Sequence, residues 1–402
     1  MFILLLHLAW RNVWRNARRT WVTISAVVFA VLIAVVMRSL QGGTYEALQR
    51  ETISMVTAEL QIQDEAYLDD PGLAHPIWAD QVSAAALDDP RIRFAEWRIE
   101  GFGLVSSEEH SAAAQLLGIG PAQKDHLSFF RDVDEMQPGR AWIGSALAEN
   151  LALSIGDSLV VITQGYQNMM GAEIFAVAGT ITTGSTEADR GLVVIAYEDA
   201  QDLFALWGGA TMMVVGTKDF HDAASVAENV SASLEGSNLV AHPWARLMPE
   251  LEQMIQMDDA SGVIFLVFLL MLVGFEVLNT TLMSVMERTK EFGVIQAVGL
   301  RPFHLAILIA LELLMRLLVS LALAMALLIP LLWVLSNTPI PIPPELLDVY
   351  QSFGIRVSEI RFSVRSSVWT IPVVAMFVIG LFSIIPPIVR LYRLNLIDAL
   401  RN

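Results

Sequence analysis

Four long apolar stretches interrupt an otherwise mixed chain of 402 residues. They occupy residues 21–38, 262–286, 303–335 and 368–389. A helix needs about 20 apolar residues to cross the hydrocarbon core of a bilayer, and each stretch comes near or exceeds that length. The pattern therefore predicts four transmembrane helices in an integral membrane protein.

Between the first and second stretches lies a polar region, residues 39–258, whose pattern changes to short alternating runs separated by turns. Residues 57–63 alternate like a strand, and residues 141–181 read as helix, turn, strand, hairpin and strand, with a turn at Gly156. We therefore expect an α+β membrane protein with a large α+β extracytoplasmic domain. It lies between transmembrane helix 1 and a C-terminal membrane domain of residues 259–402.

Residues 1–20 have the pattern of an amphipathic helix. Apolar residues recur at steps of three and four: Leu6, Trp10, Val13, Trp14, Ala17 and Trp21. Arginines fill much of the remaining surface, which favours a cytoplasmic helix lying on the inner leaflet. The alternative is the start of a continuous first span. No small-x-small cleavage site follows that span, so we interpret it as an uncleaved signal anchor.

Basic residues are concentrated in three segments that flank the apolar stretches. These are Arg11, Arg15, Arg18 and Arg19, then Arg288, Lys290 and Arg301, then Arg390, Arg393 and Arg401. With the acids Glu287, Glu291 and Asp398 they carry a net charge of +7, so the rest of the chain carries −24 of the total of −17. Because cytoplasmic loops are enriched in Lys and Arg, both termini are predicted to be cytoplasmic, and the large domain to be outside.

The composition excludes several kinds of chemistry. The chain has no cysteine, which rules out disulfides and thiolate metal sites, and its seven histidines show no paired spacing for zinc. None of its three lysines completes a GxxxxGK loop, so any ATP that drives this protein is predicted to bind another chain. We expect no catalytic residue and no metal on this chain.

Glu276, Glu312 and Arg316 are ionisable residues inside the apolar stretches. Glu312 and Arg316 are four residues apart in the favourable order, which predicts an intramembrane ion pair on one helix face, with a proton relay or substrate site as the alternative. Glu276 has no obvious partner, and is either functional or structural.

Apolar stripes also run along the first and second spans. Phe29, Ile33 and Val36 share one face, as do Phe265, Phe268, Leu269 and Leu272. Such stripes usually face lipid or pack against other helices.

The loop between the second and third spans is densely charged, yet holds no catalytic pattern. Phe292, Ile295 and Val298 lie at helical spacing, Gly299 can end a short helix and Pro302 can start the next one. This predicts a short cytoplasmic helix, residues 287–300, with one small apolar side. It suits docking on a partner, and an ordinary charged loop is the alternative.

The stretch "ERTKEFGVIQAVGLRPFHL" resembles the signature of FtsX-like ABC transporter permeases, of the MacB/LolC/LolE type. Arg288, Glu291, Gly293, Ala297 and Gly299 match it, and Phe292 stands where isoleucine is usual. The stretches "AWRNVWRNARRT", "MRSLQGGTYEAL" and "TGSTEADRGLVVIAYEDAQDLF" resemble the lipoprotein-releasing LolC/LolE branch, so the resemblance covers most of the chain.

The resemblance implies a non-catalytic subunit whose short helix couples to an ATPase. It assigns the coupling to Glu287, Arg288, Glu291, Phe292, Gly293, Ile295, Ala297 and Gly299. The expected partners are two copies of a cytosolic ABC ATPase, which bind ATP and Mg, and a second permease in a homodimer or a LolC/LolE-like heterodimer. No nucleic acid is expected.

The resemblance also implies a bacterial inner-membrane location and a lipoprotein or lipid cargo from the outer leaflet. The cargo cavity would be lined by the two stripes and Glu276. A periplasmic carrier would contact a loop with Gln164, Tyr166, Met169 and Met170. Two other functions stay open from the sequence, namely MacB-like mechanotransmission in efflux and FtsX-like activation of a cell-wall hydrolase.

Overall fold

The computed structural model describes residues 2–121, 126–127, 130, 136–183, 186–343 and 359–392. The chain divides into two compact units. The first is assigned Met1–Glu46, Ile255–Pro341 and Glu359–Asn402, and the second Ala47–Met254 and Ile342–Ser358. Arg393, Asp398 and Arg401, which contribute to the predicted basic tail, lie outside the described residues.

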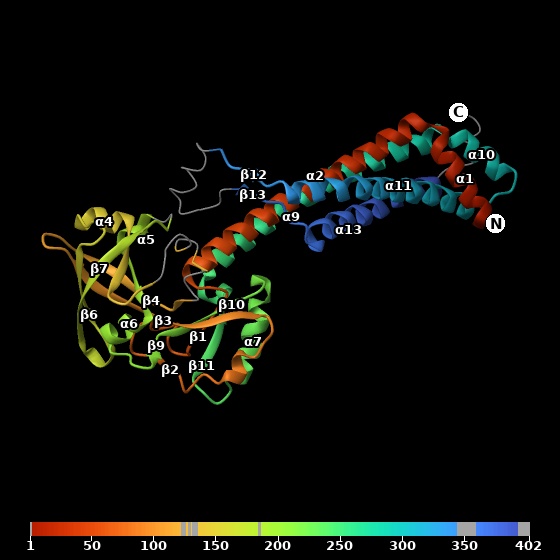
Figure 1. Ribbon diagram of the computed structural model, residues 1–402. Helices are drawn as coiled ribbons and strands as arrows, with labels where there is room; N and C mark the ends of the chain where they lie inside the picture. The colour runs from red at the N-terminus through yellow and green to blue at the C-terminus, as the bar shows by residue number, and fades with distance from the viewer. Residues whose placement is uncertain are drawn as a thin grey trace. The chain divides into compact units, whose positions relative to one another are not determined.

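The first unit is built from long helices (Figure 1). In chain order the helices that lie wholly or partly in it are α1 (Phe2–Arg15), α2 (Ala17–Val56), α9 (Pro249–Glu287), α10 (Thr289–Ala297), α11 (Pro302–Asn337), α13 (Ser366–Phe382) and α14 (Ile385–Tyr392). A two-stranded ribbon pairs β12 (Ile340–Pro341) with β13 (Glu359–Ile360). Within the described residues, four helical stretches are long and apolar enough to cross a membrane: Ala17–Arg50, Pro249–Glu287, Pro302–Asn337 and Ser366–Tyr392.

Two of these helices extend well beyond their apolar runs. The apolar pattern of α2 ends near Met37, yet the helix continues to Val56, and α9 begins at Pro249, before its apolar run. Polar contacts join the extensions: Arg38 pairs with Asp259 at 2.6 Å. Polar residues that form helices well can prolong a helix without apolar periodicity, so hydropathy marks the span and not the helix end.

Side chains from four helices form the core of the first unit. Val31 of α2, Leu270 of α9, Ala324 of α11 and Met376 of α13 are all buried in one apolar cluster. Because a bilayer offers no hydrophobic drive between helices, close packing of such side chains is what holds them together there.

The chain breaks between α1 and α2 at Asn16, where Thr20 Oγ1 donates to the carbonyl of Val13. Thus α1 is a helix distinct from the first span. Leu5 and Ala9 are buried, whereas the predicted stripe residues Leu6 and Trp10 are exposed. The helix therefore has one apolar face packed in the protein and another that remains exposed. Membrane contact through Trp10 stays a prediction.

Gly43 allows a close backbone approach on α2. A Cβ added at this position would lie 1.9 Å from the carbonyl oxygen of Arg361. Two hydrogen bonds join Ser39 of α2 to Ser363. The Ser363 N–H donates to the Ser39 carbonyl at 2.9 Å, and Ser39 Oγ donates to the Ser363 carbonyl at 2.7 Å. The segment after β13 can therefore run directly against α2.

The second unit is built around a nine-stranded sheet (Figure 1). Its strands in spatial order are β11 (Leu239–Pro243), β1 (Leu60–Asp64), β10 (Met212–Thr217), β3 (Ile92–Ser106), β4 (Ser111–Ile119), β8 (Leu192–Ala196), β5 (Arg140–Gly144), β7 (Met170–Ile181) and β6 (Ser158–Gln164). Strand β3 also pairs with β6, which closes the strands from β3 to β6 into a ring. A small ribbon pairs β2 (Ile77–Trp78) with β9 (Gly209–Ala210).

Short helices complete the second unit. These are α4 (Ser145–Leu151), α5 (Thr186–Gly191), α6 (Tyr197–Phe204), α7 (Ala223–Ser233) and α8 (Trp244–Leu247), with the 3-10 turns η1 (Ala84–Leu87), η3 (Tyr166–Asn168) and η4 (Phe220–Asp222). The pattern predicted a helix from residue 141, but Ala141 to Ile143 form part of β5. This segment pairs with β7 and β8 on both sides, and such tertiary pairing overrides local helix preference.

Candidate functional site

The short helix α10 follows directly from its sequence. It begins after Arg288 and ends at Ala297; Val298 caps it, and Gly299 follows with a left-handed φ of 106°. The Leu300 N–H donates to the Ile295 carbonyl at 3.2 Å and the Gly299 N–H to the Gln296 carbonyl at 2.9 Å. This pair of bonds is the Schellman termination that glycine favours. Pro302 then starts α11, as its missing N–H allows.

One side of α10 packs into the first unit. Phe292 is 1% exposed and Gly293 is also buried. Phe292 belongs to an apolar cluster that includes Leu5 of α1 and Leu305 of α11. These two predicted coupling residues therefore fix the helix in place and do not present a surface to a partner.

The opposite side of α10 is open. Lys290, Val294 and Val298 are exposed and follow one another at steps of four, and Val298 is 85% exposed. Glu291, Ala297 and Gly299 from the predicted set are exposed as well. The family signature did not include Lys290, Val294 or Val298. The predicted apolar side grouped Val298 with Phe292, which is wrong, because Phe292 is buried whereas Val298 is exposed. Their i, i+4 spacing on a two-turn helix is the sequence signal that could have found this face.

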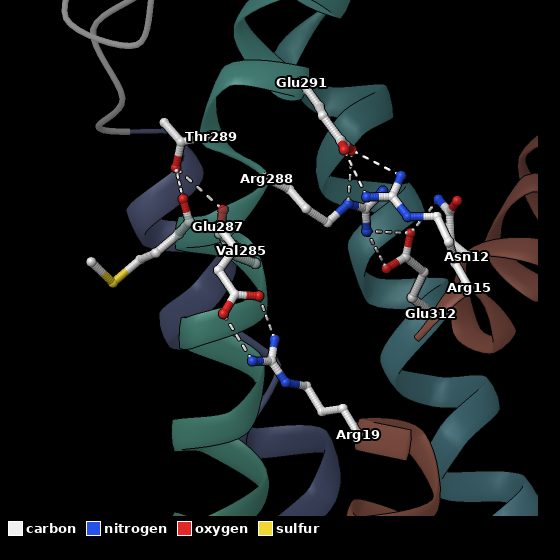
Figure 2. Close-up of polar contacts among 10 residues, drawn as sticks. Asn12, Arg15, Arg19, Val285, Glu287, Arg288, Thr289, Glu291 and Glu312 are labelled. Atoms are coloured by element: carbon white, nitrogen blue, oxygen red, sulfur yellow. Dashed lines mark hydrogen bonds and ion pairs between the residues drawn. The ribbon is translucent and has the colours of Figure 1, made fainter. Parts of the chain in front are cut away.

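Ion pairs tie α10 and the end of α9 to the N-terminal helices (Figure 2). Arg15 of α1 donates through both terminal nitrogens to Glu291, at 2.6 and 3.1 Å. Arg19 of α2 makes the same two-bond contact with Glu287, at 2.6 and 2.9 Å. The Arg15 guanidinium holds the pKa of the Glu291 carboxyl below its ordinary value. Paired arginine–carboxylate bonds of this kind fix orientation as well as distance.

Glu312 of α11 is bound from two other helical segments (Figure 2). Arg288 Nη1 donates to its two oxygens at 2.9 and 3.1 Å, and Asn12 Nδ2 donates to Oε1 at 2.6 Å. Arg288 also contacts Glu291 at 3.3 Å and lies over the Phe292 ring. The buried Glu312 carboxylate thus joins α1, the start of α10 and α11.

The predicted ion pair between Glu312 and Arg316 is not formed. Among the described residues the ion pair of Glu312 within 4 Å is with Arg288. The sequence spacing identified Arg316 as a cation on the same helix face. It could not show that Arg288, which is 24 residues earlier in the chain, is the arginine that pairs with Glu312.

An apolar groove of about 740 Å³ lies between α2 and α9. Five predicted cavity residues line it: Phe29, Ile33, Leu269, Leu272 and Glu276. Phe265 lines a neighbouring hollow of about 350 Å³, together with Leu269, Arg38 and Asp258. Val36 and Phe268 line neither hollow. Ala26, Phe275 and Leu282 also line the groove, and the predicted stripes do not include them.

Glu276 lies at the polar end of this groove. It accepts a hydrogen bond from Thr280 Oγ1 at 3.3 Å and is exposed. Together with Asn279 it also lines a hollow of about 660 Å³ whose other residues include Arg18 and Arg19. The carboxylate therefore lies where apolar lining changes to polar lining.

The predicted partner loop of the second unit connects β6 to β7. Gln164 pairs in register with Met170, and the Gly165 N–H donates to the Met169 carbonyl at 2.6 Å. Tyr166 packs edge-on against Trp78, so this ring supports the loop. Met169 and Met170 are exposed, Met170 at 83%. Exposed methionines of this kind suit adaptable contacts with a partner.

No group of three or more His, Cys, Asp or Glu side chains that could hold a metal ion is found within the described residues. The placement of nucleotide and metal on another chain stays a prediction.

Residues 263–396 match the family described as FtsX-like permease C-terminal. The lipoprotein-releasing system transmembrane protein LolC of Xylella fastidiosa (strain 9a5c) is 28% identical over 256 residues, covering 60% of this chain and 61% of that protein. LolC of Neisseria meningitidis serogroup B is 19% identical over 297 residues, covering 70% of this chain and 69% of that protein. The chain thus spans about three fifths of the length of the Xylella relative, at 61%.

Among solved structures, the periplasmic region of MacB from Actinobacillus actinomycetemcomitans aligns with a TM-score of 0.36 and 10% identity, covering 50% of this chain and 94% of that one. The four apolar helices and the FtsX-like match together indicate a multi-pass inner-membrane protein. The chain therefore carries an FtsX-like permease domain in residues 263–396 and is similar to LolC proteins over 60% of its length.

Proposed function

We propose that this chain is the non-catalytic permease subunit of an ABC transporter. A separate cytosolic ATPase hydrolyses ATP and acts on the membrane unit through α10. The FtsX-like match includes all of α10, and the relatives named LolC are transmembrane proteins of a lipoprotein-releasing system.

The construction of α10 carries this proposal. The helix is buried through Phe292 and tied by ion pairs to α1, while Lys290, Val294 and Val298 are exposed on the other side. A rigidly held helix with exposed apolar residues suits insertion into a groove on a partner. Arg288, at the start of α10, also binds Glu312 of α11, so a movement of α10 would be transmitted to the transmembrane helices.

The charge distribution supports the orientation of this subunit. Arg15 belongs to α1, Arg19 to the start of α2 and Lys290 to α10, and Arg288 lies between α9 and α10. Basic residues near span ends favour the cytoplasmic side, so both termini and α10 are cytoplasmic and the second unit is periplasmic.

The groove between α2 and α9 supports a lipid-like cargo. Its lining is apolar along Phe29 and Leu272 and is polar at Glu276 and Asn279. Acyl chains of a lipoprotein from the outer leaflet of the inner membrane fit this lining. We include in the proposal a second permease, identical or related, two ATPase copies, and a periplasmic carrier that contacts Met169 and Met170.

A direct test of docking compares two matched substitutions. In nanodiscs, Val294→Glu should abolish binding of the cognate ATPase because it places a charge on the exposed apolar face of α10. Ile155→Glu makes the same kind of change at an exposed position of the second unit and should leave binding intact. Equal binding by both variants would contradict the assigned docking face.

The cargo is tested by purifying the complex from its native membrane and identifying bound molecules by mass spectrometry. Acylated lipoprotein peptides should co-purify, and adding them should change the ATPase rate. Recovery of a soluble adaptor or a cell-wall hydrolase, with no acylated peptide and no response to lipid, would contradict lipoprotein release.

A further inference from the structure

Glu312 is a buried carboxylate with a partner from another segment of the chain. It is 4% exposed, and both of its oxygens are occupied by Arg288 or Asn12 (Figure 2). Arg288 directly precedes α10 and will move with that helix, whereas Glu312 belongs to α11.

A second guanidinium lies one helical turn away. Arg316 is 9% exposed, and its buried Nε has no hydrogen-bond partner in the described part of the chain. Glu312 and Arg316 are on the same helix with the acid first, which is the favourable order for an i, i+4 pair. A buried guanidinium within an apolar helix is costly unless a partner is available.

We propose that Glu312 exchanges Arg288 for Arg316 when α10 moves. The proposal rests on the proposed function only in that the ATPase supplies the movement. In the observed state Arg288 holds the carboxylate, and Arg316 has no ion pair among the described residues. When α10 withdraws Arg288, a change of side-chain rotamer lets Arg316 take its place. The buried Glu312 carboxylate is then paired with a cation both before and after the movement. Because each pairing corresponds to one placement of α10, that helix has two discrete positions relative to α11.

The other two ion pairs of this cluster have no such requirement. Glu291 and Glu287 have side chains that are 44% and 46% exposed, so water can replace Arg15 or Arg19. Glu312 lacks that option because its side chain is 6% exposed. The exchange is therefore expected at Glu312 and not at the neighbouring pairs.

Thermal unfolding of the full chain in nanodiscs tests the exchange without any ATPase. Arg288→Met and Arg316→Met should each lower the melting temperature modestly, because the other arginine can serve Glu312. The double variant should lose more than the sum of the two, because the acid is then buried without a cation. Adding Glu312→Gln to the double variant should restore much of the loss. Additive losses, or no rescue by Glu312→Gln, would overturn the proposal.

A matched control uses Arg38→Met combined with Arg316→Met. Arg38 pairs with Asp259 at the other end of the first span, so the two losses should add. Coupling stronger than additive here would show general destabilisation and would count against the exchange.

A second measurement separates this proposal from the proposed function. In the complex with its ATPase, Arg316→Met should bind the ATPase as the wild type does but release less cargo per ATP hydrolysed. If Val294→Glu leaves ATPase binding unchanged, docking at α10 fails, while the unfolding comparison still decides on the exchange. Wild-type cargo release per ATP by Arg316→Met would refute its role in coupling.

Discussion

Arg15 and Glu291 form a two-bond ion pair although 276 residues separate them in the chain. The contact joins the N-terminal helix α1 to the exposed helix α10. It lies beside Arg288, which contacts Glu291 and Glu312 at once. The N-terminal helix is therefore part of the structure that holds α10.

Replacing Arg15 should weaken the binding of the ATPase to α10 but should have little effect on the melting temperature of the protein. Arg15→Gln leaves Glu291 with Arg288 alone, and exposed ion pairs contribute about 0–1 kcal/mol, so the melting temperature should change little. Affinity for the ATPase should fall about two- to fivefold, since a tenfold change corresponds to about 1.4 kcal/mol. Titration calorimetry of the complex measures this directly.

Arg11→Gln is the control for Arg15→Gln. Arg11 lies one turn earlier on α1, is exposed, and has no ion pair among the described residues. It should leave the affinity unchanged. A similar loss in both variants would mean that general positive charge on α1, and not the contact with Glu291, sets the affinity.

Filling the groove between α2 and α9 should block cargo but not the ATPase. Ala26 lines the groove, so Ala26→Trp places a large ring inside a hollow of about 740 Å³. Cargo release by the reconstituted complex should fall while ATPase binding remains. Ser25→Trp, at the preceding exposed position outside the lining, should release cargo normally. Undiminished release by Ala26→Trp would remove the groove from the cargo path.

The elements that sequence predicted best are those set by local pattern. A few neighbouring residues are enough to predict each of these features. They are the four apolar stretches, the glycine that follows α10 and the proline at which α11 begins. The same holds for the groove residues Phe29 and Leu272, because helical spacing alone puts each on the face of its stripe.

The elements that sequence did not predict depend on contacts between distant residues. Nothing near Glu312 in the sequence reveals that Asn12 and Arg288 bind it. Likewise, the family signature marked Phe292 for coupling, whereas only the packing against Leu5 and Leu305 shows that it faces inward. In the second unit, the pairing of β5 with β7 and β8 replaced a predicted helix start for the same reason.

A methyl group at Gly43 should destabilise the first unit. Alanine usually favours a helix over glycine by about 1 kcal/mol, but here its Cβ would lie 1.9 Å from the Arg361 carbonyl oxygen. The overlap forces the segment away from α2, and we expect a net loss of about 1–3 kcal/mol in unfolding free energy. Gly72→Ala, where the added Cβ has no neighbour within 4 Å, should not reduce the melting temperature.

His242 should make the second unit less stable in mild acid. It is buried on β11 opposite Gln61, and its Nε2 has no hydrogen-bond partner in the described part of the chain. Burial, with Arg246 nearby, lowers the pKa of this imidazole from its ordinary value of 6.5. The unfolded chain therefore binds a proton below pH 6.5 that the folded unit does not yet accept. Its stability is thus complete above that pH and is lost as the pH falls toward the lower, folded pKa.

The measurement is the melting temperature of the second unit's transition in the full chain, followed from above to below pH 6.5 in the wild type and in His242→Gln. The wild type should lose stability over this interval, and the variant should lose less because it has no imidazole to protonate. His110→Gln, at an exposed histidine of the same unit, should follow the wild type. If His242→Gln loses as much stability as the wild type, another group is responsible for the acid sensitivity.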